Sequence, residues 1–337
     1  MRKWLMIEIC LLVLVLIVGV AACFGVFQGA FAPASLDTPE ITDAAQLNPT
    51  EQTMEETTEP EPTWMTFPAD RELTAQQAFV YDCNNDSFTY LIGSESDRVY
   101  PASITKLFTA YVALQFLEPE QIITAGDALE FVGVGSSVAE IEEGNILSVK
   151  MLVEAMLLPS GNDASYILAA AAGRAMEKDE SLSATEAVEA FVKEMNGQAR
   201  ALGMKGTQFL NPDGYHEYEH YTTNKDLVTI GKLALENDTI MQYAAVSSEN
   251  AVFESGEMKQ WKNTNALIDP ESEYYCPYAT GLKTGQTPSA GSCLLSSFDV
   301  EGKEYIIGVF GCPEINDRFA DTLQLLNQAL GMADIAG

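Results

Sequence analysis

Histidine and basic residues are scarce in this chain. Of its 337 residues two are histidines, and 18 lysines and arginines stand against 49 aspartates and glutamates, which gives a formal net charge of −31. A charge of this sign repels the phosphates of nucleic acids. We therefore expect no nucleic-acid partner.

The two histidines leave little room for histidine chemistry. His216 and His220 lie beside Glu217 and Glu219 in a loop-like acidic segment, and the chain has no Gly-x-Ser-x-Gly motif, so we do not expect a Ser-His-Asp triad. A zinc site of the His-Glu-x-x-His kind needs these residues on a helix, which this segment does not predict. We interpret both histidines as solvated loop residues and predict neither a metal nor a cofactor.

Charge is missing from a long stretch near the N-terminus. Arg2 and Lys3 precede an uncharged run over 9–27 that is long enough to cross a bilayer as a helix. Basic residues at the front keep that end in the cytoplasm, which predicts that the rest of the chain lies outside. Because the run is longer than a usual signal core, we favour a membrane anchor over a cleaved signal peptide for residues 1–34, although Ala32-Pro33-Ala34 resembles a cleavage site.

Residues 35–72 are rich in threonine, proline and acids, as in TMEETTEPEPTW, and show no apolar periodicity. We predict a solvated stalk, extended by like-charge repulsion, that holds a folded domain over 73–337 away from the membrane. Outside the cell, disulfides are possible among Cys83, Cys276, Cys293 and Cys312. Cys293 and Cys312 lie in neighbouring β-like runs and are candidates for a cross-strand pair, but small buried thiols are at least as good an interpretation.

Strand patterns occupy both ends of the predicted domain. A hairpin is indicated around Asn84-Asn85-Asp86, helical periodicity dominates from 106 to about 250, and strands return from Ala279, with a final helix over 317–330. This order predicts an α/β fold of the α+β type. Its mainly antiparallel sheet is flanked by helices and receives a large helical insertion, with a cleft where the two parts meet.

The stretch PASITKLFTA places Ser103 three residues before Lys106 at the start of a predicted helix. Residues at this spacing share a helix face, so the two side chains can touch. A serine in the first turn lies near unpaired backbone N–H groups that can stabilise an oxyanion, and a neutral lysine can take its proton. Neutrality requires burial or a second cation, for which Lys283 is a candidate. The pair alone is a weak signal, because Ser-x-x-Lys is common on solvated helices.

Two further elements are individually ordinary. LLPSGNDAS puts Ser160 and Asn162 in a turn, where they can relay a proton and bind a peptide group or simply cap a helix. GLKTGQT puts Lys283, Thr284 and Gly285 in a strand-like run, where glycine permits close approach of a ligand and lysine with threonine suits a carboxylate. An edge strand with a protective lysine is the plain alternative.

The three elements gain meaning from their joint order. Ser-x-x-Lys, Ser-x-Asn and Lys-Thr-Gly form the set of penicillin-binding proteins and class A β-lactamases. Across residues 74–331 the chain resembles the serine D-alanyl-D-alanine carboxypeptidases, the low-molecular-mass penicillin-binding proteins, in these elements and in FVKEMNGQARALGMKGTQFLNPDG, HYTTNKDL and GLKTGQTPSAGSCLL. The resemblance implies a DD-peptidase/β-lactamase-like fold.

The resemblance also implies catalytic roles and partners. Ser103 would be acylated by the penultimate D-alanine of a peptidoglycan stem peptide, with Lys106 as general base. Ser160 and Asn162 would handle protons and substrate orientation, with Lys283 beside them. β-Lactams would be covalent inhibitors.

Substrate-binding roles follow from the same resemblance. The backbone N–H groups of Ser103 and Gln286 would hold the oxyanion. Thr284 and Arg318 would hold the terminal carboxylate, a task that suits a guanidinium, and Gly285 would let the substrate approach closely. The chain ends soon after its last predicted helix, without the β-rich domain and amphipathic tail of many relatives, so anchoring would fall to the N-terminus.

Two alternatives remain beside this interpretation. A class A β-lactamase needs a Glu-x-x-Leu-Asn stretch to activate water, and none occurs between Ser160 and Lys283. A tethered module could bind wall peptides or β-lactams without turnover. The presence of every expected catalytic residue argues against such a module.

Overall fold

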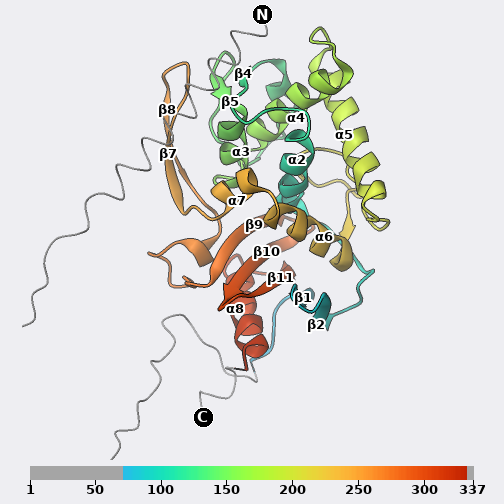
Figure 1. Cartoon of the computed structure of the whole chain (residues 1–337), viewed down its shortest axis with the longest axis vertical. Coiled ribbons are helices and arrows are strands. Elements are labelled where there is room, and N and C mark those ends of the chain that lie inside the picture. The colour runs from blue at the N-terminus through green and yellow to red at the C-terminus, as the bar shows by residue number, and fades with distance from the viewer. Residues whose placement is uncertain (1–70, 332–337) are drawn as a thin grey trace, which may run out of the picture. The chain divides into compact units, whose positions relative to one another are not determined.

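One antiparallel sheet joins strands from both ends of the domain. In this computed structural model, which describes residues 71–331, five strands lie in the order β2-β1-β11-β10-β9 (Figure 1). Their bounds are Gln77–Asp82 (β1), Ser87–Ile92 (β2), Ala279–Thr287 (β9), Gly291–Val300 (β10) and Lys303–Cys312 (β11). β1 pairs with β11, so the early hairpin completes a sheet begun by the late strands.

Helices fill the middle of the chain, as its periodicity predicts. They are α2 (Thr105–Ala113), α3 (Val149–Leu157), α4 (Asn162–Glu177), α5 (Ala184–Ala201), α6 (Asn224–Leu235) and α7 (Asp238–Ala244), followed after the sheet by α8 (Asp317–Ala329). Short 3-10 turns are η1 (Ala102–Ile104), η2 (Asp127–Phe131) and η3 (Ala266–Ile268). Two-stranded pairs are β3 (Arg98–Val99) with β6 (Thr222–Thr223), β4 (Ile122–Thr124) with β5 (Ile146–Ser148), and β7 (Ser248–Val252) with β8 (Met258–Lys262).

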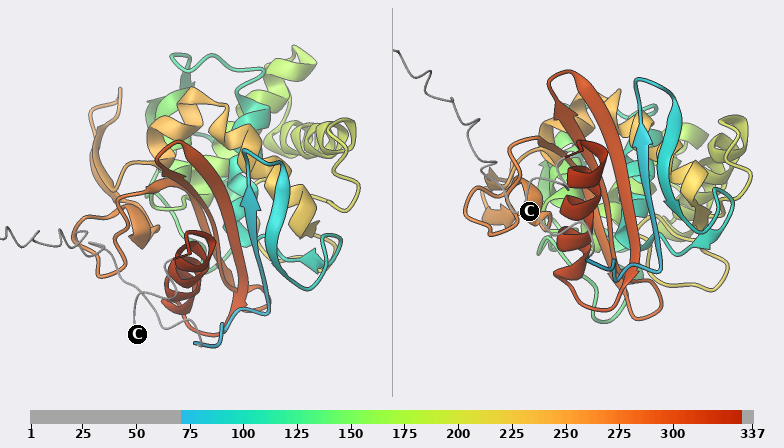
Figure 2. Two further views of the ribbon diagram at one scale, coloured as in Figure 1. Left: turned by 60° about the horizontal axis from the view of Figure 1, so that its bottom comes forward. Right: turned by 90° about the horizontal axis from the view of Figure 1, so that it is seen from below.

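Both faces of the sheet are covered. α8 lies on one face, and the helical part, with α6 nearest, lies on the other (Figure 2). Successive residues of β11 point to opposite faces, so Ile306 packs in the cluster under the helical part while Ile307 packs with Leu323 of α8. Gly231 lets α6 approach closely, because a Cβ there would lie 3.0 Å from the Ile306 side chain. Each face of the sheet therefore contributes side chains to a different hydrophobic cluster.

The contacts of the folded domain reach back to Arg71. Its guanidinium pairs with Asp321 of α8 at 2.7 Å, and the same carboxylate accepts the backbone N–H groups of Thr74 and Ala75. The predicted anchor and nearly all of the predicted stalk lie outside the described residues. Within 71–331, no helix has the length and apolarity required to cross a membrane.

The cysteines of the described region form no disulfide. A β-bulge shifts the register of β10 against β11 so that Ser292, not Cys293, lies opposite Cys312. Cys276, Cys293 and Cys312 are buried thiols. The interpretation as small buried residues therefore holds, and the cross-strand pair is wrong.

Candidate active site

Ser103 lies on η1, a short 3-10 turn directly before α2, and not within the long helix that the sequence predicts. Ala102 enters this turn with a φ of +48°, a conformation rare outside glycine. Lys106 follows in the first turn of α2, and its Nζ lies 2.9 Å from Ser103 Oγ. The two side chains are therefore in direct contact.

Lys106 is fully buried. Its Nζ donates to Asn162 Oδ1 and to the backbone carbonyl of Asp213, each at 2.7 Å. Both oxygens can only accept, so a neutral amine uses its two N–H groups on them and directs its lone pair at Ser103 Oγ. Burial lowers the pKa of Lys106 from 10.5 to about 8, against the opposing charges of Asp213 and Asp163. In this geometry a neutral Lys106 amine can accept a proton from Ser103.

The Ser-x-Asn element reaches the lysine through its asparagine. Asn162 begins α4, and its Nδ2 donates to Ser136 Oγ at 2.9 Å. Ser160 is buried in the turn between α3 and α4, with a φ of +65°. Within 71–331 its hydroxyl forms no hydrogen bond to Lys106 or Lys283, so direct contact joins Ser103, Lys106 and Asn162 but not Ser160.

Lys283 lies on the edge strand β9 but is not a protective surface lysine. Its side chain is buried, and Nζ lies 3.4 Å from Thr264 Oγ1 and 3.3 Å from the carbonyl of Thr284. Burial, followed by the positive charges of Lys106 and Arg318, holds the pKa of Lys283 well below its ordinary value. A buried amine whose charged form is disfavoured therefore lies near Lys106.

Gly285 brings β9 against the serine turn. A Cβ at this position would lie 2.9 Å from the carbonyl oxygen of Pro101 and 3.3 Å from the backbone nitrogen of Ser103. Any side chain would push the strand away. The neighbouring Gln286 lines the groove beside Ser103.

Arg318 approaches β9 from α8. Its Nη1 donates to the carbonyl of Gly285 at 3.3 Å, and the side chain is buried. Burial lowers the pKa of Arg318 to about 10. Among residues 71–331 it forms no ion pair, and its buried Nε has no hydrogen-bond partner. The guanidinium thus retains donor capacity close to the Lys-Thr-Gly element.

A groove of about 430 Å³ opens beside Ser103. Ser103, Asn162 and Gln286 line it together with the loops over 134–137 and 213–216. It therefore lies between the helical part and the edge of the sheet, where the sequence predicts a cleft.

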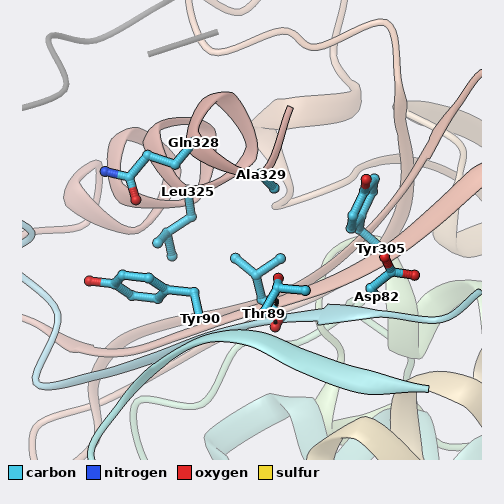
Figure 3. A pocket seen from close by; sticks show the side chains of 8 residues that line it. Asp82, Thr89, Tyr90, Tyr305, Leu325, Gln328 and Ala329 are labelled. Carbon is cyan, nitrogen blue, oxygen red and sulfur yellow. Dashed lines mark hydrogen bonds between the residues drawn. The ribbon is translucent and has the colours of Figure 1, made fainter. Parts of the chain in front are cut away.

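A second cavity, of about 330 Å³, lies between the sheet and α8 (Figure 3). Tyr90 and Leu325 face each other across it, and Asp82, Tyr305 and Gln328 add polar groups. These residues supply no nucleophile with an adjacent base. The groove at Ser103 is therefore the candidate active site.

We did not predict from the sequence that Asp213 and Gly214 contact Lys106 and the turn that carries Ser103. Gly214 has a φ of +80°, and a Cβ there would lie 1.8 Å from the carbonyl oxygen of Ala102. The loop therefore fits closely against the serine turn, where the Asp213 carbonyl receives Lys106. The turn-forming Asn-Pro-Asp-Gly at 211–214 carried this signal.

Asp163 was also missed as a support of the groove. Its carboxylate accepts the backbone N–H groups of Ala139 and Ile141, at 2.9 and 3.0 Å. These bonds hold the loop that follows Ser136 against the start of α4. Nothing in the local pattern distinguishes this aspartate from a helix-terminal acid.

The interpretation of His220 as a solvated residue is wrong. The side chain is buried, its Nδ1 accepts from the backbone N–H of Leu210 at 3.2 Å, and Nε2 lies 2.9 Å from Thr105 Oγ1. Burial lowers the pKa of His220 to about 3, which keeps it neutral. His216 is half-buried against Tyr100. Although HEYEH has the His-Glu-x-x-His order, the segment is not a helix, and the described residues contain no cluster suited to a metal.

An antiparallel sheet with a Ser–Lys pair at the head of a helix beside its edge strand is typical of the penicillin-interacting serine enzymes. The family model for D-alanyl-D-alanine carboxypeptidase, peptidase family S11, matches residues 63–314, and the chain belongs to this family. This membership confirms the resemblance and, with the structure, the expected fold.

Relatives of known sequence cover most of the chain. It is 31% identical over 240 residues to D-alanyl-D-alanine carboxypeptidase DacF of Bacillus subtilis. The matched region covers 70% of this chain and 57% of DacF. It is 30% identical over 262 residues to the D-alanyl-D-alanine carboxypeptidase of Streptomyces sp. strain K15, covering 75% and 86%. The chain thus spans little more than half of one relative and most of the other.

Solved structures agree with this assignment. The Streptomyces K15 DD-transpeptidase is 27% identical, with a TM-score of 0.69 over 77% of this chain and 98% of that one. Penicillin-binding protein D2 of Listeria monocytogenes, solved with ampicillin bound, is 26% identical with a TM-score of 0.61 over 76% and 97%.

Proposed function

We propose that the protein is a serine D-alanyl-D-alanine carboxypeptidase that removes the terminal D-alanine from peptidoglycan stem peptides. The observation that carries this proposal is the buried Lys106 amine, which is bonded to two carbonyl oxygens and faces Ser103 Oγ at 2.9 Å. Burial gives this amine the lowered pKa that a base needs near neutrality.

Catalysis begins when Ser103 Oγ passes its proton to Lys106 and attacks the carbonyl carbon of the penultimate D-alanine. The backbone N–H groups of Ser103 and Gln286 stabilise the oxyanion. Asn162 orients the peptide, and Lys106 returns the proton to the nitrogen of the departing D-alanine as the C–N bond breaks. A relay through Ser160 would first require its hydroxyl to turn toward Lys106. Water, deprotonated by Lys106, then hydrolyses the ester and frees Ser103.

The strand side of the groove binds the terminal carboxylate. Arg318 supplies positive charge, Lys283 supplies N–H donors, Thr284 supplies a hydroxyl, and Gly285 allows the peptide to approach the strand. β-Lactams also carry a carboxylate near the acyl carbon, so they acylate the same serine. The ampicillin-bound relative supports this part of the proposal.

The same proposal places the enzyme outside the cytoplasm, where peptidoglycan lies. Residues 1–34 attach it to the membrane as a retained anchor or direct it there as a signal peptide. Residues 35–72 form the acidic stalk of the catalytic domain.

Labelling with a fluorescent penicillin tests the proposal. Wild-type ectodomain becomes covalently labelled, Ser103→Ala does not, and wild type releases D-alanine from an acylated peptide that ends in D-Ala-D-Ala. Labelling without D-alanine release would favour the non-catalytic binder, and rapid penicillin hydrolysis without peptide cleavage would favour a β-lactamase-like enzyme.

A further inference from the structure

Thr264 lies beside the carboxylate-binding residues of β9 but comes from another segment. It lies between β8 and η3, and its Oγ1 is 2.5 Å from Thr284 Oγ1 and 3.4 Å from Lys283 Nζ. Its side chain is exposed, whereas Lys283 and Thr284 are buried. One hydroxyl thus contacts both polar groups of the Lys-Thr-Gly element.

The backbone of Thr264 is held firmly on both sides. Asn263 and Asn265 are buried, and their side-chain amides donate to carbonyls at the end of α7 and to Gly281 of β9. The N–H of Thr264 itself donates to the carbonyl of Leu158, two residues before the Ser-x-Asn element. Hydrogen bonds therefore fix the position of the backbone that carries the exposed hydroxyl.

The hydrogen-bonding capacity of these groups limits the direction of the bonds. A hydroxyl has one hydrogen and two lone pairs. Lys283 donates to Thr264 Oγ1, and either hydroxyl can be the donor in the bond between Thr264 and Thr284. When Thr264 is the donor, the hydrogen of Thr284 is left for another acceptor.

We propose that Thr264 is a positioning residue that turns the Thr284 hydroxyl into a donor for the substrate carboxylate. The inference rests on the proposed function and deepens it. A carboxylate only accepts hydrogen bonds, so it needs Thr284 in this orientation. Without Thr264, the Thr284 hydrogen can turn away and the Lys283 ammonium loses an acceptor.

Three variants test this inference. Thr264→Val removes the hydroxyl at nearly constant shape, and Thr264→Ser keeps the hydroxyl. Thr280→Val is the matched control, because it removes another inter-residue hydroxyl pair of β9, that of Thr280 with Ser297 at 2.7 Å. The measured quantities are the second-order acylation rate constants with benzylpenicillin and with its uncharged methyl ester, together with the melting temperature.

We expect Thr264→Val to lower the acylation rate constant about tenfold with the acid and little with the ester. A tenfold loss is the scale of one hydrogen bond to a charged group. Thr264→Ser should restore the ratio of acid to ester rates, and Thr280→Val should leave it unchanged. An equal loss on acid and ester, or wild-type rates on both, overturns the inference alone. Wild-type protein that neither labels at Ser103 nor releases D-alanine overturns the proposed function and the inference with it.

Discussion

The two walls of the groove hold their basic side chains differently. On the helical wall, the Lys106 amine has three contacts between 2.7 and 2.9 Å. On the strand wall, Lys283 and Arg318 make contacts of 3.3–3.4 Å, and the Arg318 Nε finds no partner within the described region. Burial lowers the pKa on both walls, so burial alone does not assign a task. The close contacts suit proton exchange with one hydroxyl, whereas spare donors suit an incoming anion.

Removing the closely held amine should have the largest effect. Lys106→Ala should slow acylation by penicillin about 10³-fold or more, because the general base is lost. Stopped-flow or gel labelling measures the rate, and thermal melting checks the fold. Lys150→Ala, which removes an exposed lysine paired with Glu120 at 2.7 Å, is the control. Undiminished D-alanine release by Lys106→Ala would refute the assignment of the base.

The pH dependence of acylation should report the protonation of Lys106 on the helical wall. Only the deprotonated Lys106 amine accepts a proton, so with a pKa of about 8 the rate should fall by about tenfold per pH unit below that value. Above it, where the amine is already neutral, the rate should level off. Acylation rates at constant ionic strength measure the profile, and a rate that is constant from about pH 6 to 8 would contradict it.

Moving β9 away from η1 should slow acylation less than removing the Lys106 amine does. Gly285→Ala places a Cβ 2.9 Å from the Pro101 carbonyl, which pushes β9 away from η1 and from the oxyanion site. Acylation should slow by about tenfold to a hundredfold. Gly126→Ala is the control, because no atom lies within 4 Å of its added methyl. Equal rates in the two variants would mean that the close approach is dispensable.

Weakening the strand wall should change binding more than chemistry. Arg318→Ala should raise KM for a peptide with a free C-terminal carboxylate by about tenfold while changing kcat less. Steady-state D-alanine release measures both constants. Arg174→Ala, which removes an ion pair to Asp127 at 3.3 Å on a different surface, is the control. If Arg318→Ala lowers kcat/KM equally for amidated and free peptides, the arginine does not recognise the carboxylate.

The smallest effect is expected at Gln286. Its backbone N–H serves the oxyanion in the proposed mechanism, and the backbone persists in Gln286→Ala. Acylation should therefore change by no more than about threefold, within the range of a peripheral side-chain contact. The same labelling assay measures it, and a loss comparable to that of Gly285→Ala would assign the side chain a direct role.

Much of the fold could be predicted because its signals are local. The turn at Asn84-Asn85-Asp86 joins β1 to β2, and the final helix begins at Asp317 as expected. His220 could not be placed, because its burial depends on Thr105, a residue distant in sequence. The position of Cys293 relative to Cys312 depends on a β-bulge next to Ser292, which no local sequence pattern predicts.

The candidate site divides in the same way. The spacing of Ser103 and Lys106 determines their contact, since three residues span about one helical turn whether the turn is 3-10 or α. The sequence could not reveal that the Asp213 carbonyl receives the lysine or that Thr264 reaches Thr284.

The sequence by itself determined the order of elements, the motif residues and, through their resemblance to known enzymes, the family, because these depend on neighbours along the chain. Only the tertiary structure decided which loops close on Lys106 and which cations keep spare donors. Those properties arise where segments distant in sequence exclude water together, and burial there sets both the pKa and the hydrogen-bond partners.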